Sequence, residues 1–356
     1  NVGSLVGTSG GPVSNVYGDS VNVHGTGSGN GEDSVGGLIG YTSSSAATVA
    51  NAHVSGTVVG DHYLVGGIVG YAYGDITNSY NLATVYGGQI NSLFIGGIVG
   101  SINGANLQYV YNYGNIGTVD DQLVGGIAGN LGTANMDSAY NAGTVTGYAK
   151  IGGLAGASGD STISNSYNTG TVNGNAAEAS VVGGLVGEFS VSTITNSYNS
   201  GAVTTGLAST EIGGLVGRTV NNGNTISNSF WDVDSSGQTA PIGNNSDSTV
   251  PTNTYAGCFN GTCSNLSGVD SAYLIGGTTA ANLSTLSTYT NNGWSNITSD
   301  PSAASGSTWF IFNGIDDFLT SGKTRPMLMM EASTGSISNL HQLQLMGANL
   351  SGNYTY

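Results

Sequence analysis

Residues 65–70 read VGGIVG, and this block decides the fold because it recurs along the chain. Full copies begin with Gly-Gly pairs at positions 36, 66, 96, 125, 152, 183 and 213, and a degenerate copy begins at Gly3. Subtracting each position from the next gives successive steps of 30, 30, 29, 27, 31 and 30 along the chain. A near-constant period of this size indicates a repeat protein whose units stack on one another.

A second block keeps the same frame. It reads ITNSYN at residues 76–81, ISNSYN at residues 163–168 and ITNSYN at residues 194–199. Looser copies centre on Tyr17, His53, Tyr111, Tyr140 and Phe230. Two independent blocks in one frame make a chance repeat negligible.

Each repeat holds two or three apolar runs of four to six residues, separated by Gly, Asn, Ser or Thr. Runs of this length that are rich in β-branched residues predict strands rather than helices. We therefore expect an all-β protein, a right-handed parallel β-helix (β-solenoid) of about eight coils over residues 1–230. An irregular cap or insertion is expected at residues 231–335, and a resumed β-repeat segment of a longer chain at residues 336–356.

Strand alternation predicts that Gly66, Ile68 and Gly70 share one face, where glycine leaves room in a narrow interior. Glycine also permits positive φ angles at tight corners. A turn at the Asn-x-Gly that follows each tyrosine would let Ile163, Tyr167 and Val172 all point inward. Identical positions are then expected to line up as aliphatic, tyrosine and asparagine columns.

The two blocks resemble the GLUG motif repeats, which are named for their Gly-Leu-(any)-Gly block. The resemblance covers roughly residues 1–230, and residues 228–239, NSFWDVDSSGQT, look like the usual exit from such an array. Residues 337–345 and 350–354 are similar to the repeat that resumes in filamentous-haemagglutinin-like bacterial surface exoproteins. The resemblance implies an extracellular β-helix that is exported as a long stalk by two-partner secretion, with further domains outside this chain.

Charge excludes several classes of partner. The chain has 20 acidic residues against 4 basic ones and a formal net charge of -16. Such a surface repels phosphate backbones and anionic lipids, so we expect neither nucleic-acid binding nor membrane insertion. No transmembrane stretch or signal peptide is recognised, and we expect a fragment or a processed product of a longer protein.

Two features indicate an oxidising, extracellular setting. Cys258 and Cys263 lie close together in a polar stretch and predict a small loop-closing disulfide. Asn-x-Ser/Thr sequons occur only in the C-terminal part, at Asn244, Asn260, Asn265, Asn282, Asn296, Asn349 and Asn353. They predict glycosylation, with chance in an Asn-, Ser- and Thr-rich chain as the alternative.

Acidic residues precede the glycine blocks and would lie along one edge of the solenoid. Glu32, Asp33, Asp61, Asp120 and Asp121 are the candidates for weak calcium binding, because carboxylates of neighbouring coils can share a hard cation. The alternative is a set of solvated, solubilising loops. No other cofactor is expected.

Two other classes compete with a structural role. A polysaccharide-cleaving β-helix enzyme needs paired carboxylates in one groove, and the nearest cluster is Asp316-Asp317 with Lys323 and Arg325, which we interpret as a loop salt bridge. A polysaccharide-binding surface would use exposed aromatic residues. Tyr41, Tyr71 and Tyr73 are the candidates, with edge packing as the alternative.

The sequence thus favours a non-enzymatic adhesin, an extracellular structural or adhesive stalk on a bacterial cell surface. The expected partners are glycans or proteins on host cells, matrix or neighbouring cells, as in a biofilm. Self-association into filaments is a related expectation, because open solenoid ends expose strand edges.

Overall fold

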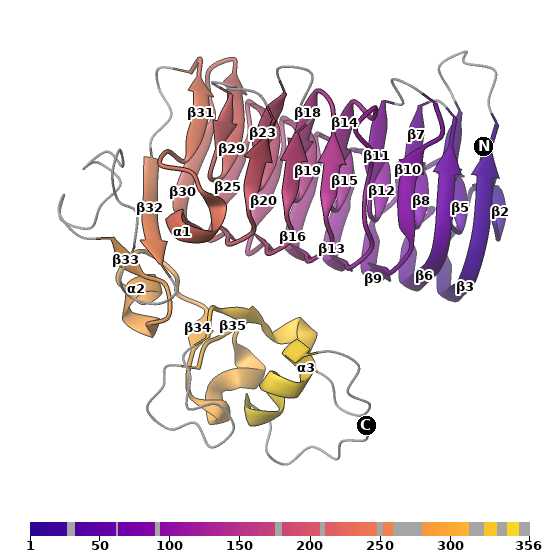
Figure 1. Ribbon diagram of the computed structural model, residues 1–356. Helices are drawn as coiled ribbons and strands as arrows, with labels where there is room; N and C mark the ends of the chain where they lie inside the picture. Colours follow the sequence, from indigo (N-terminus) through magenta and orange to yellow (C-terminus); the bar gives the residue numbers. More distant parts are fainter. Residues whose placement is uncertain are drawn as a thin grey trace. The chain divides into compact units, whose positions relative to one another are not determined.

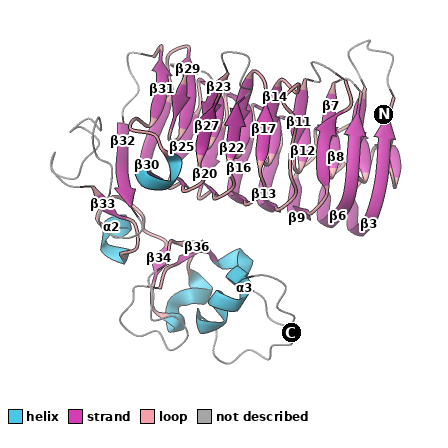
Figure 2. Ribbon diagram, viewed as in Figure 1, coloured by secondary structure: helices cyan, strands magenta, loops and turns pink. Residues whose placement is uncertain are grey.

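The computed structural model shows two compact units, Asn1–Thr254 and Tyr255–Tyr356 (Figure 1). The structure describes residues 1–26, 33–61, 63–89, 93–174, 180–206, 211–247, 252–258, 280–312, 324–332 and 340–348. Strands fill the first unit, and most of the helical turns lie in the second (Figure 2). The two units are described separately.

The first unit is a β-solenoid in which the coils add parallel strands to shared sheets. Sheet A contains β1 (Val2–Gly3), β4 (Ser34–Gly36), β7 (Leu64–Gly66), β11 (Phe94–Gly96), β14 (Leu123–Gly125), β18 (Lys150–Gly152), β23 (Val181–Gly183) and β28 (Ile212–Gly213). These eight strands, one for each described coil, pair in sequence order, so the expected stack of about eight coils, each spanning one period of the repeat, is confirmed. The right-handed sense of winding stays a prediction.

Sheet B follows sheet A in every coil. It contains β2 (Val6–Ser9), β5 (Ile39–Thr42), β8 (Val69–Ala72), β12 (Val99–Asn103), β15 (Ala128–Gly132), β19 (Ala155–Gly159), β24 (Val186–Ser190), β29 (Val216–Val220) and β31 (Ile242–Asn245). Because β31 pairs with β29, the solenoid continues past the expected boundary at residue 230.

Sheet C carries the asparagine–tyrosine block of each coil. Its strands in the solenoid are β3 (Val13–Gly25), β6 (Val49–Gly60), β9 (Ile76–Asn81), β10 (Thr84–Gly87), β13 (Asn106–Asn112), β16 (Asn135–Asn141), β20 (Thr162–Ser164), β21 (Tyr167–Asn168), β25 (Thr193–Thr195), β26 (Tyr198–Asn199) and β30 (Thr225–Asp232). A short sheet follows it in the later coils, with β17 (Val145–Gly147), β22 (Val172–Gly174) and β27 (Val203–Thr205).

The glycine block forms a corner, so the expected continuous strand through Gly66, Ile68 and Gly70 is wrong. β7 ends at Gly66 and β8 begins at Val69, and Val65, Ile68 and Val69 are all fully buried. A Cβ atom on Gly66 would lie 1.9 Å from the carbonyl oxygen of Val69. None of the glycines at these corners has a positive φ, so they are required for close backbone approach and not for backbone conformation.

The second glycine of the pair faces a buried asparagine ladder. Asn81 Nδ2 donates to Asn112 Oδ1, and the pattern continues through Asn141, Asn168 and Asn199 with distances of 2.8 to 2.9 Å. Each Oδ1 also accepts the N–H two residues later, which confirms the predicted Asn-x-Gly turns. Trp231 takes the register position after Asn199 and ends the ladder.

One residue of each coil in sheet C has a left-handed conformation. The column consists of Asn15, Asn51, Asn78, Tyr109, Ser138, Asn165, Asn196 and Asn228, with φ between 47° and 57°. Asparagine tolerates this region better than most residues, which explains its place in the block.

The tyrosines of sheet C lie on the opposite side of their strands from the ladder asparagines, and Tyr140, Tyr167 and Tyr198 are fully buried. The expectation that Tyr167 points inward with Ile163 stays a prediction. Each tyrosine directly precedes a ladder asparagine in a strand, and adjacent residues of a strand face opposite sides. Tyr17, at the first position of the column, is 61% exposed. The rings stack from Tyr17 through His53 and five further tyrosines, with centroids 4.3 to 5.1 Å apart.

The end of the solenoid contains α1 (Val233–Ser236), and β32 (Thr252–Cys258) crosses the boundary between the units. The second unit contains β33 (Ala281–Asn282), α2 (Leu286–Thr290), β34 (Ile297–Thr298), η2 (Pro301–Gly306), β35 (Trp309–Phe310), β36 (Met327–Leu328), η3 (Met329–Glu331), α3 (Leu340–Leu345) and η4 (Met346–Ala348). Its core includes Ala304, Phe310, Phe312, Met327, Leu345 and Ala348.

The segment expected to resume the β-repeat at residues 336–356 is helical where the structure describes it. Residues 340–348 form α3 and η4. Leu340 and Leu343 are three residues apart, as on one face of a helix, whereas Leu343 and Leu345 alternate as in a strand, so the spacing of this short run did not decide between the two. In the part of the chain that the structure describes, no helix is long and apolar enough to cross a bilayer.

Candidate binding surface

The outward side chains of sheet B form a column whose chemistry changes along the solenoid. Strand register aligns Thr8, Tyr41, Tyr71, Ser101, Asn130, Ala157, Glu188, Arg218 and Asn244. Thr8 and Asn244 stand at the two ends of this column. Between them the residues are aromatic in the second and third coils, small or polar in the next three, and charged at Glu188 and Arg218. A repeat scaffold with an invariant interior thus carries three different outer surfaces.

The structure brings together the three tyrosines that the sequence singled out. Tyr41 and Tyr71 stack with centroids 5.7 Å apart, and Tyr73 packs edge-on against both rings, at 6.1 and 5.0 Å respectively. Burial and a hydrogen bond with Tyr73 raise the pKa of Tyr71 well above its usual value, so this phenol stays neutral. Tyr73 remains 37% exposed.

A surface recess of about 350 Å³ adjoins this aromatic cluster. Its lining consists of Ser43, Ser44, Ser45, Tyr73, Asn103 and Gly104. These residues offer one aromatic ring, hydroxyl groups and one amide, with no ionisable carboxylate or base. Sequence reasoning identified Tyr73 but missed the serines, Asn103 and Gly104.

The signal for the recess was present in the spacing of the two blocks. In each coil, a stretch of chain runs from the first glycine of the Gly-Gly pair to the inward aliphatic residue of sheet C. This stretch is longer in one coil, from Gly36 to Val49, than in the next, from Gly66 to Ile76. The following four coils share one interval that lies between these two. The recess is lined by residues of these two irregular coils and by Asn103 and Gly104 of the next, regular coil.

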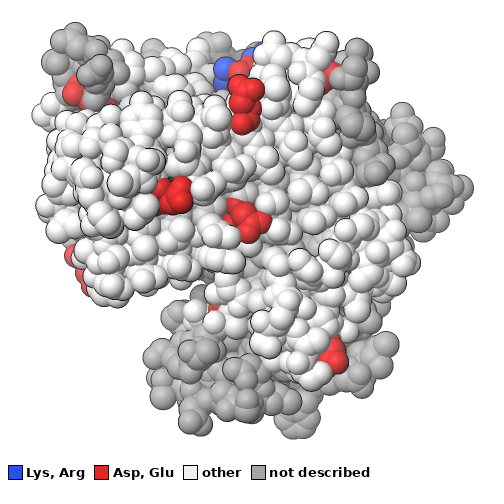
Figure 3. All heavy atoms as spheres, turned by 180° about the vertical axis from the view of Figure 1, so that it is seen from behind, with Lys and Arg blue, Asp and Glu red and all other residues white. Residues whose placement is uncertain are grey.

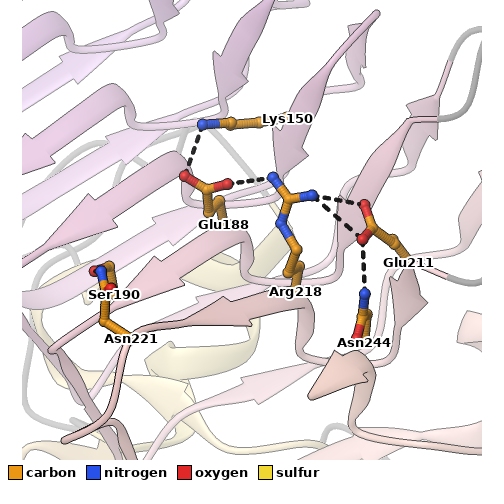
Figure 4. A network of polar contacts seen from close by, with 7 residues as sticks. All are labelled: Lys150, Glu188, Ser190, Glu211, Arg218, Asn221 and Asn244. Carbon is orange, nitrogen blue, oxygen red and sulfur yellow. Dashed lines mark hydrogen bonds and ion pairs between the residues drawn. The ribbon is translucent and has the colours of Figure 1, made fainter. Parts of the chain in front are cut away.

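The charged end of the column is an ion-pair network (Figure 4). Lys150 Nζ lies 2.6 Å from Glu188 Oε1, and Arg218 bridges Glu188 and Glu211, with Nη1 3.0 Å from Glu211 Oε2. Burial alone would raise the pKa of Glu188, but the hydrogen bonds and charges of Lys150 and Arg218 outweigh it and lower that pKa. The network links successive coils and balances two positive against two negative charges.

The predicted calcium ligands have other partners or lie apart. Asp61 Oδ1 lies 2.8 Å from His24 Nε2, and Asp121 is buried by its own loop. Glu32 lies outside the described residues, and within the described ones no group of three or more His, Cys, Asp or Glu side chains could hold a metal. On the face drawn in Figure 3, acidic side chains are scattered among uncharged residues, except for one group that lies beside basic side chains. Calcium binding through Glu32, Asp33, Asp61, Asp120 and Asp121 stays a prediction.

Asp121 is a buried acid. Its Oδ2 accepts hydrogen bonds from the backbone N–H of Gly87 and Thr118 at 3.1 and 2.7 Å, whereas Oδ1 has no partner among the described residues. Burial is the main cause that raises the pKa of Asp121 to about 6, and those two N–H donors oppose it. This carboxyl group therefore titrates near neutrality.

Three sequons fall on described residues with different surroundings. Asn244 Nδ2 donates to Glu211 Oε1 at 2.8 Å, Asn282 Oδ1 accepts from Ser284 N and Oγ, and Asn296 is exposed. The hydrogen bond to Glu211 of the ion-pair network therefore competes with a glycan for the side-chain amide of Asn244. The sequons at Asn260, Asn265, Asn349 and Asn353 lie outside the described residues, as do Cys263 of the predicted disulfide and the Asp316-Asp317 pair with Lys323.

Comparison with protein families matches two stretches of the solenoid. The model of the GLUG motif matches residues 61–86 and 147–173. The chain therefore contains GLUG motif repeats. Strand register places the glycine blocks of neighbouring coils at equivalent positions, with Gly66, Gly96 and Gly125 aligned. No curated protein and no solved structure matches the chain.

Proposed function

We propose that this chain is a structural and adhesive stalk that acts outside the cell. The observation that carries the proposal is the unbroken register from β1 to β28 in sheet A and from β2 to β31 in sheet B. Each coil contacts its neighbours through strand ladders, buried aliphatic residues and side-chain ladders. An array of this kind forms one continuous scaffold that can carry different outer residues at different levels.

The surface chemistry supports an extracellular location on a bacterial cell. The chain has 4 basic residues in 356, and its outer face relies on Ser, Thr, Asn and Tyr for solvation. With a net charge of -16, contacts with glycans or proteins are favoured over nucleic acids or anionic lipids. The proposed partners are surface glycans or proteins of host cells, matrix or neighbouring cells. The same proposal includes export by two-partner secretion, a haemagglutinin-like parent protein and self-association into filaments.

The second candidate function is polysaccharide binding. The cluster of Tyr41, Tyr71 and Tyr73 beside a neutral recess favours it. Cleavage would need two carboxylates that face one groove, and the described lining of this recess has none. We therefore propose that the chain binds surfaces without catalysing a reaction.

Adhesion of coated beads tests the proposal. Beads that carry the full chain should attach to epithelial cells, matrix or bacterial biofilm, and a Gly159→Ala chain should behave alike, because a Cβ atom there meets nothing within 4 Å. A Gly126→Ala chain should lose attachment, since a Cβ atom there would lie 2.2 Å from the carbonyl oxygen of Gly153. Wild-type beads that attach to none of these surfaces more than uncoated beads do would refute the adhesive role.

A further inference from the structure

The recess beside Tyr73 exists because three neighbouring coils turn from sheet B to sheet C with corners of different length. The corner has six residues between β5 and β6, three between β8 and β9, and two between β12 and β13. Stacked corners of equal length would leave a flat edge. Here the long serine corner stands on one side, the short corner at Gly104 lies on the other, and Tyr73 comes from the coil between them.

The ring of Tyr73 is held in place before any ligand binds. Its backbone N–H donates to Oγ1 of the fully buried Thr42 at 3.0 Å, and the next N–H, of Gly74, donates to the same oxygen at 3.3 Å. Its ring packs edge-on against Tyr71 and Tyr41. A fixed aromatic ring that is still 37% exposed offers stacking area with little loss of side-chain entropy on binding.

Gly104 keeps the recess open. The equivalent residues of the following coils are Thr133, Asp160, Val191 and Asn221, all with side chains and with φ between 49° and 59°. Gly104 has a φ of 69°, and a Cβ atom there would meet nothing within 4 Å. There is space for a side chain at this corner, and Asn221 shows that asparagine adopts the same left-handed conformation at an equivalent position. Glycine occurs beside the recess.

We propose that this recess binds one unit of an uncharged saccharide, with the ring of Tyr73 as the stacking platform. The proposal rests on the adhesive function proposed above and names its ligand class. Hydroxyl groups of Ser43, Ser44 and Ser45 and the amide of Asn103 both donate and accept, as sugar hydroxyls require. The lining holds no basic group to pair with a uronic acid, and a volume of about 350 Å³ lies at the lower end of small-molecule sites.

Titration of the full chain with neutral oligosaccharides and with matched uronic-acid oligosaccharides tests this proposal. The wild type should bind neutral oligosaccharides and prefer them to the acidic ones. Gly104→Asn should weaken binding by about tenfold or more, because asparagine fits this backbone and its side chain projects from a corner that lines the recess. Tyr73→Ala should weaken binding by a similar factor, since it removes the platform.

Val191→Asn is the matched control, since it places the same residue at the equivalent corner of a distant coil, and its affinity should equal that of the wild type. Unfolding temperatures of all variants show whether the fold is retained. Unchanged affinity in folded Gly104→Asn and Tyr73→Ala, no binding of neutral oligosaccharides, or preference for uronic acids would each overturn the proposal. If coated beads still attach in that case, the adhesive function stands and only the saccharide site falls.

Discussion

Single residues show where the repeat departs from its own rule. Val191 occupies the left-handed corner position with a φ of 49° and is 41% exposed. A β-branched side chain is a poor fit for this region, whereas Asn221 at the equivalent position of the next coil fits it. The sequence could not reveal this strain, because the corner conformation is visible only once the coils are aligned in space.

Replacing Val191 with asparagine should therefore stabilise the protein. We expect the free energy of unfolding to rise by about 1 kcal/mol, the order of the cost of a left-handed residue. Chemical denaturation of the variant and wild type measures the difference. Val119→Asn serves as the control, because Val119 is 50% exposed and does not have a positive φ. An equal gain in both variants would mean that removal of an exposed apolar side chain, and not relief of strain, stabilises the chain.

Asp121 predicts a pH dependence of stability. Its pKa of about 6 in the folded state lies above that of an unfolded aspartate, so the folded state binds the proton more tightly. The stabilising contribution is complete below the unfolded pKa and is lost as the pH rises through about 6. Unfolding midpoints of wild type and Asp121→Asn are measured at pH 4, 5, 6 and 7. The difference in midpoint between the two proteins should change across this window. A constant difference would contradict the account.

At the scale of the element, the two sequence blocks depend on each other. In the five coils of the ladder, the second glycine of the pair leaves the space that an asparagine fills, as with Gly126, where a Cβ atom would lie 2.4 Å from Cγ of Asn141. The repeat of both blocks was sufficient to predict stacked strands. It did not predict the corner at each glycine pair. The alternation rule assumes a straight strand, whereas this chain bends at Gly67-Ile68 and passes through a left-handed residue at Asn78.

The asparagine ladder should contribute strongly to stability. Asn141→Ala removes four hydrogen bonds and leaves buried partners on Asn112, Gly143 and Asn168 unsatisfied. We expect a loss of about 4 kcal/mol in the free energy of unfolding. Asn135→Ala in the same strand is the control: its side chain is exposed and donates to Asn106, so its loss should stay below about 0.5 kcal/mol. Similar losses in both variants would show that the buried ladder has no special weight.

Glycine packing gives an independent test at the same scale. Gly126→Ala should lower the free energy of unfolding by about 3 kcal/mol or more, because the added Cβ atom meets backbone and Asn141. Gly159→Ala should be neutral or stabilise by about 0.5 kcal/mol, since that site is open and its φ is not positive. Thermal unfolding of the two variants separates a steric role of the glycines from a general sensitivity to their loss.

For the whole molecule, the period of the sequence predicts the architecture but not its ends or its outer surface. The interior repeats because every coil needs the same corners and ladders, so a periodic sequence is sufficient to describe it. The end of the array at Asn245, the helices of the second unit and the recess beside Tyr73 arise where the period fails. Features that depend on differences between neighbouring coils have to be read from the structure.

Distances between spin labels test the stacking of the coils most directly. With Cys258 and Cys263 changed to serine, one label at Ser227 is paired in turn with labels at Ser164, Gln108 and Ala50, which register places two, four and six coils away in sheet C. Pulsed electron paramagnetic resonance should give backbone separations that grow by about 4.8 Å per coil, from about 10 Å to about 19 and 29 Å. Separations that do not grow by this constant step per coil would contradict the stacked rod. Broad distance distributions that are unrelated to register would contradict it too. Either result would also remove the basis of the proposed stalk function.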